Sequence, residues 1–174
     1  MIKEEIIQRA DEFLQNTSDA ALNKYMNEVS SAQGDMVSYV VAMGEILDDE
    51  EYFNKYIYFY LLVHRAYTNR FRFFPKLTSE IIRQIEDNNQ QFFAELLDKE
   101  PEVFEKEMED YIRKHPQKLL IDFITLDLFE SEESAYDDIG LQMDNQIFFL
   151  LLTIINIYEQ SLVESQKEMN KDTL

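Results

Sequence analysis

Cysteine is absent from this chain of 174 residues, and glycine, proline and histidine are rare. Without cysteine there can be no disulfide, thiolate nucleophile, iron–sulfur cluster or cysteine-based zinc site. The three scattered glycines, Gly34, Gly44 and Gly140, cannot form the glycine-rich loop of a P-loop or dinucleotide-binding fold. Neither a His-Glu-x-x-His motif nor a Gly-x-Ser-x-Gly turn occurs, which argues against the hydrolases that these motifs identify.

Long hydrophobic runs are also missing. The longest uncharged apolar stretches, 57–63 and 147–155, are much shorter than the roughly 20 residues that a membrane span requires. The first residues are charged from Lys3 onward and do not resemble a signal peptide. We therefore expect a cytoplasmic protein that does not associate with membranes.

Basic residues are few, and the formal net charge is −19. A surface this negative repels nucleic-acid phosphates, so we expect no general nucleic-acid binding, whereas a basic protein partner would be attracted. The hydrophobic content of 45% is too high for a disordered chain and fits a core-forming domain. We predict one domain over residues 1–174.

Apolar residues recur at intervals of three and four along most of the chain, and strict alternation is absent. This pattern predicts an all-α fold with about eight helices. The fourth and last helices are apolar on nearly every side, which places them at the centre of the fold. The first expected helix runs from about 3 to 15, the second follows Ser18 and the third follows Gly34-Asp35. The others run from about 50 to 73, from 79 to 97, from 101, from 116 and from 142 to 169.

The order of helix lengths indicates a possible internal repeat, residues 1–76 and 77–170. Shifting the first half by 82 positions places Leu22 on Phe104 and Met26 on Met108 without a gap. Such a duplication would give two four-helix units packed through their long helices. Helical arrays of this kind are more often binding scaffolds than catalysts.

The abundant acids raise the possibility of a cation site. Carboxylates at i and i+3 bind Mg²⁺ in some all-α hydrolases, but 35 acids produce such pairs by chance. Glu45 and Asp127 are better candidates because each follows an apolar residue by four and the shift makes them equivalent. With His64, they could line a polar cleft between the halves; otherwise the acids lie at the core rim and His64 is a hydrogen-bonded core residue. The acidic stretch 130–140 lacks the ligand spacing of an EF-hand, so we expect a solvated loop.

One segment reverses the overall charge. Residues 52–79 contain no acid and hold five of the 16 basic residues, interleaved with aromatics. Arginine and aromatic residues are enriched at protein interfaces, and arginine also pairs with phosphate. The alternative is that these side chains serve the core and pair with acids of the same chain. The candidate partner- or anion-binding residues are Arg65, Arg70, Phe71, Arg72 and Lys76.

These observations favour a non-enzymatic protein-interaction or regulatory module with a protein partner and no cofactor. An acidic antagonist of a basic protein, such as an immunity-type protein, is one concrete form. The alternative is a hydrolase that uses Mg²⁺ or Mn²⁺ on a phosphorylated small molecule, with the arginines holding the phosphate. A structural or storage role is a third possibility.

Overall fold

The computed structural model describes residues 1–71, 74–129 and 138–171, without the side chains of 138–139 and 166–171. This part of the chain contains eight helices and no strand, which confirms the expected all-α fold. The helices are α1 (Glu4–Asn16), α2 (Asp19–Ala32), α3 (Gly34–Gly44), α4 (Glu50–Arg70), α5 (Ser79–Leu97), α6 (Pro101–Lys114), α7 (Lys118–Phe129) and α8 (Asp138–Lys171).

Several helices begin where local chemistry favours a start. The Asp49 carboxylate accepts a hydrogen bond from the Glu51 amide at the start of α4, and Pro101 occupies the first turn of α6, where no amide donor is required. Ser18 is the N-cap residue of α2, but its side chain makes no capping hydrogen bond. Helix α4 ends at Arg70, three residues before the predicted end.

Helices α4 and α8 form a parallel pair at the centre of the fold. Lys55 pairs with Asp144, His64 with Tyr158 and Tyr67 with the Ile155 carbonyl, so the sequence separation across the pair stays between 88 and 94 residues. A nearly constant separation means that both helices run in the same direction.

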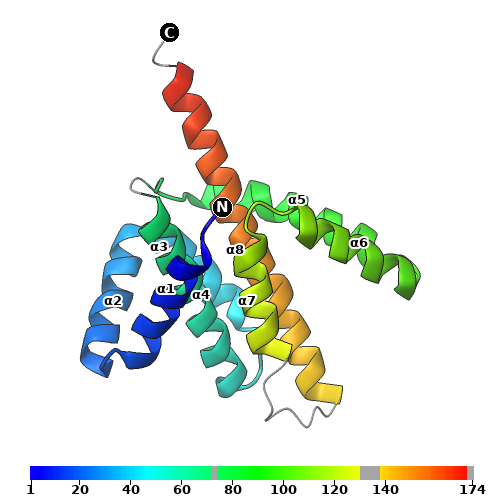
Figure 1. Cartoon of the computed structure of the whole chain (residues 1–174), viewed down its shortest axis with the longest axis horizontal. Helices are drawn as coiled ribbons and strands as arrows, with labels where there is room; N and C mark the ends of the chain where they lie inside the picture. Colours follow the sequence, from blue (N-terminus) through cyan, green and yellow to red (C-terminus); the bar gives the residue numbers. More distant parts are fainter. Residues whose placement is uncertain (72–73, 130–137, 172–174) are drawn as a thin grey trace.

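The remaining helices pack around this pair in a similar order in each half. Helices α1 and α3 pack on α4, while α5 and α7 pack on α8; α2 then lies on α3, and α6 on α7. Two further contacts, α3 with α5 and α1 with α7, join the halves. Helix α8 runs through the middle of the molecule, and its last turns extend beyond the other helices (Figure 1).

By length and composition alone, residues Gly140–Ser165 of α8 could span a membrane, although uncharged runs in the sequence are short. Within the fold, 72% of an apolar 18-residue stretch of this segment is buried. The apolar character of α8 therefore corresponds to its central position among the other helices.

Two buried glutamines hold the extended segments that precede α1 and α5. The side-chain oxygen of Gln117 accepts from the Ile2 amide at 2.7 Å, and that of Gln33 accepts from the Leu77 amide at 2.9 Å. Both glutamines directly precede a helix, and Ile2 and Leu77 are fully buried. Glutamines at corresponding positions in the two halves thus accept the same kind of backbone hydrogen bond.

The internal repeat itself stays a prediction. The starts of α1 and α5 are 75 residues apart, those of α2 and α6 are 82 apart, and the offset grows to 84 and 88 for the last two pairs. A single shift of 82 therefore aligns only part of the chain, and a full correspondence requires gaps in the loops.

Candidate functional site

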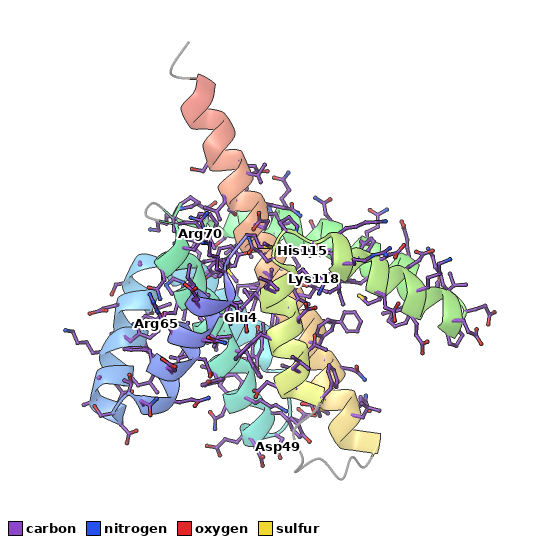
Figure 2. The ribbon with its side chains drawn as sticks, viewed as in Figure 1. Glu4, Asp49, Arg65, Arg70, His115 and Lys118 are labelled. Carbon is purple, nitrogen blue, oxygen red and sulfur yellow. The ribbon has the colours of Figure 1, made fainter. Side chains whose placement is uncertain are left out.

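The aromatic and basic end of α4 makes contacts within the chain. The Arg65 guanidinium lies 3.3 Å from the ring centre of Phe13 in α1 and 5.1 Å from that of Tyr25 in α2. Arg70 donates from Nε to the Met1 carbonyl at 3.3 Å, and Phe71 stacks on the Tyr67 ring. Figure 2 shows Arg65 beside α1 and α2, whereas Arg70 lies near the N-terminus. The cation–π contacts and the backbone hydrogen bond give both arginines a structural role.

Of the other two candidates of this segment, the structure describes only one. Lys76 is exposed in the linker before α5, and Arg72 lies outside the described residues. Any partner-binding role of this segment stays a prediction, and three of its five candidate residues already stabilise packing around α4 and the N-terminus.

The structure does not bring Glu45, His64 and Asp127 together. Glu45 is exposed just after α3, and Asp127 is exposed on α7, while His64 is buried between α4 and α8. Partial desolvation raises the pKa of Asp127, with the Asp11 charge adding to this effect and Lys55 opposing it. No polar cleft shared by the three candidates is formed by the described residues.

His64 lies in a layer of tyrosines in the core. Its Nδ1 atom is 2.8 Å from the Tyr158 hydroxyl, and the rings of Tyr25, Tyr60 and Tyr158 surround it. Burial lowers the pKa of His64 to about 4, and burial also raises the pKa of Tyr158 well above its ordinary value. His64 is therefore a neutral, hydrogen-bonded core residue at physiological pH.

A second polar network surrounds the C-terminal half of α8, and sequence periodicity did not indicate it. The backbone N–H of Gln117 donates to Nδ1 of His115 at 3.0 Å. The proton of the His115 ring is therefore on Nε2, which donates to the side-chain oxygen of Asn156 at 2.9 Å. That oxygen also accepts from the Tyr111 hydroxyl, and Asn156 donates to Asn89. Every ring atom of His115 that can bond is occupied, which makes it a structural residue. His115 appears in Figure 2 beside the start of α7.

A surface hollow of about 430 Å³ opens beside this network, between α5, α6 and the α6–α7 turn. Phe92, Tyr111 and His115 line it together with charges of both signs, including Asp110 and Lys114. Lys114 pairs with Asp110, so the hollow presents no charge of a single sign that would select a ligand.

An apolar groove between α3, α5 and α8 is a further candidate binding surface in the described part of the chain. Its volume is about 350 Å³, within the range of ligand pockets, and apolar atoms dominate its lining. Ile46 and Leu97 lie at its edge with 50% and 61% of their surfaces exposed. Its main apolar residues are Met43, Ile46, Phe93, Leu97, Phe149 and Leu150.

The polar lining of this groove includes two acceptors, on Gln146 and Glu86, beside the donors of Tyr39 and Gln90. The side-chain oxygen of Gln146 is buried and has no hydrogen-bond partner among the described residues. Glu86 accepts from Gln90 at 3.2 Å and lies beside the Tyr39 hydroxyl, and desolvation raises the pKa of its carboxyl. The Thr153 hydroxyl is occupied by the Phe149 carbonyl of its own helix. A ligand that enters the groove thus meets apolar walls and one carboxylate, that of Glu86.

Acids predominate in the segments around the groove, although Arg83 lies on α5 and Lys99 directly follows Asp98. Residues 34–54, 84–98 and 119–166, which include all of its lining, contain no lysine or arginine. No described cation forms an ion pair with Glu86. The acids on or beside the groove-lining positions are Glu45, Glu86, Asp87, Glu95 and Asp98.

Sequence reasoning missed this groove because it is formed by three helices that are distant in sequence. The available signal was the long stretches without basic residues, which coincide with its walls. Among the described residues, no three His, Asp or Glu side chains are grouped so that they could hold a metal ion. The hydrolase alternative stays a prediction.

No protein-family model, curated protein or solved structure matches this chain.

Proposed function

We propose that the protein is a non-enzymatic interaction module that binds a segment of another protein in the α3/α5/α8 groove. The observation that carries this proposal is the exposed pair Ile46 and Leu97 at the edge of a concave apolar surface. Large apolar side chains beside a preformed groove are typical of surfaces that a partner covers. The groove thus replaces the arginine-rich end of α4 as the preferred partner surface.

Site-specific photo-crosslinking tests this function. A photoreactive phenylalanine derivative would replace Leu97 at the groove edge, or Leu126 on α7 as a control of similar exposure, 52%. In cells of the source organism, we expect a defined protein adduct from position 97 and none from position 126. The partner contact would be restricted to the groove in that case.

A groove-filling variant completes the test. Ala94 lines the groove, so Ala94→Trp should occupy it and remove the adduct. Ala21→Trp adds the same indole to an exposed position on α2 and should leave the adduct unchanged. Equal adducts at positions 97 and 126, or an adduct that persists in Ala94→Trp, would refute the proposed function.

A further inference from the structure

We infer that the segment bound in the α3/α5/α8 groove is a basic amphipathic helix, an assignment that rests on the proposed function. Three features of the groove specify this partner: its shape, the kind of polar group it offers and the charge around it.

The shape of the groove fits a helix. Its wall on α5 extends from Glu86 to Leu97, a length of about 16 Å at the rise of an α-helix. About three helical turns of a partner could lie along this wall, with apolar side chains at i, i+4 and i+7 directed between the helices. Met43, Phe93 and Phe149 would form the apolar surface beneath them.

Two acceptors of the groove favour a partner that brings donors. The buried oxygen of Gln146 has no donor among the described residues, and the desolvated Glu86 carboxylate has no ion pair with a cation there. The partly desolvated Glu86 carboxylate lines the groove without a cation, and a lysine or arginine of the partner would supply one. An acidic or purely apolar partner would leave the Gln146 oxygen without a donor and Glu86 without a cation.

The charge around the groove also favours a basic partner. The acids next to groove positions include Glu45 beside Ile46 and Asp98 beside Leu97. They outnumber the nearby basic residues Arg83 and Lys99, and Lys99 is already paired with Glu107. Together with the net charge of −19, these acids would accelerate association with a basic segment and repel an acidic one. A second copy of this chain carries the same negative charge and is therefore disfavoured as the occupant.

Three synthetic peptides separate the assignment of the partner from the proposed function. Each has about 16 residues with leucine at the same helical positions, and the polar face is all lysine, all glutamine or all glutamate. Binding to the full chain is measured by calorimetry and by amide chemical shifts. We expect the lysine peptide to bind at least about tenfold more tightly than the glutamine peptide, with shifts confined to the groove, and the glutamate peptide not to bind.

Charge variants test the role of Glu86. Glu86→Gln should weaken the lysine peptide about tenfold and leave the glutamine peptide unchanged. Glu12→Gln removes the same charge from an exposed position on α1 and should change neither affinity by more than about twofold. The preference for lysine should also shrink when salt rises from about 50 mM to about 500 mM.

The outcomes distinguish the two claims. Equal binding of the lysine and glutamine peptides in the groove would overturn the basic partner and leave the interaction function in place. Lysine-peptide shifts spread over the whole surface, or unaffected by Ala94→Trp, would also overturn it. If none of the peptides binds and Leu97 gives no specific adduct, the proposed function fails. A dimer in sedimentation analysis that Ala94→Trp abolishes would assign the groove to a second copy.

Discussion

At the residue scale, His64 links core packing to pH. Its pKa falls from an ordinary value of 6.5 to about 4 because burial disfavours the charged ring. Between these pH values the unfolded chain binds the proton and the folded chain does not. The contribution of neutral His64 to the free energy of unfolding is therefore complete above pH 6.5. About 3 kcal/mol of the free energy of unfolding is lost as the pH falls from 6.5 toward 4.

Two measurements check this prediction. The His64 ring resonance, observed by NMR, should titrate near pH 4, and urea unfolding should show a steeper loss of stability on acidification than in His64→Gln. That variant keeps a polar side chain at this position but has no proton to bind in this range. A ring resonance that titrates near 6.5 would contradict the predicted burial effect.

The buried glutamines provide a second prediction at this scale. Gln117→Ala and Gln33→Ala each leave a buried backbone amide, of Ile2 or Leu77, without its acceptor. Each change should reduce the free energy of unfolding by about 1–3 kcal/mol in urea titrations. Gln15→Ala, which removes an exposed glutamine from α1, should cost less than about 0.5 kcal/mol. Similar losses for all three variants would show that the hydrogen bonds of Gln117 to Ile2 and of Gln33 to Leu77 do not stabilise the fold.

At the element scale, the contact between α3 and α4 depends on a glycine. A Cβ atom on Gly44 would lie 2.7 Å from the Phe53 ring and 3.2 Å from the Tyr56 ring. Gly44→Ala should therefore lower the free energy of unfolding by about 1–3 kcal/mol, despite the better helix propensity of alanine. Gly34→Ala meets no atom within 4 Å and should be neutral or stabilising by up to about 1 kcal/mol. Thermal or urea unfolding of the two variants tests this contrast, and equal effects would contradict it.

The parallel α4/α8 pair depends on an ion pair that is partly buried. Lys55 Nζ lies 2.8 Å from Asp144 Oδ1, and the Asp144 side chain is only 5% exposed. Lys55→Met would leave that carboxylate buried without its cation and should cost about 3 kcal/mol or more. Lys24→Met, which breaks an exposed pair with Glu28 on α2, should cost less than about 1 kcal/mol.

A double variant tests the coupling directly. Adding Asp144→Asn to Lys55→Met removes the unpaired charge and should restore much of the lost stability in urea titrations. If the two changes add without recovery, the pair does not couple α4 to α8.

The helices were largely predictable from the sequence, whereas the groove was not. Apolar periodicity and breakers such as Pro101 act locally, so the expected and observed boundaries of α5 agree and those of α1 differ by one residue. Gln33 and Gln117 gave no signal because a buried polar residue before a helix resembles any loop glutamine until its distant partner is known. The groove likewise depends on how α3, α5 and α8 meet, and periodicity within one helix does not specify that arrangement.

At the scale of the whole molecule, the central α4/α8 pair bears on whether 1–174 folds as one domain. Tyr56, Tyr60 and Tyr67 of α4 are buried in the fold, and α5, α7 and α4 all cover α8. Fragments 1–76 and 77–174 would each expose one of these apolar helices to water. We therefore expect that neither fragment alone unfolds cooperatively or shows dispersed amide resonances.

Mixing the fragments should reverse this loss. Because α4 and α8 bury each other, the co-refolded fragments should form a 1:1 complex with a cooperative thermal transition, observed by circular dichroism and sedimentation. Fragment 77–174 carrying Asp144→Lys should fail to assemble, since it would face Lys55 with a like charge. A fragment that unfolds cooperatively as a monomer would instead show two independent units, each able to fold without the other half.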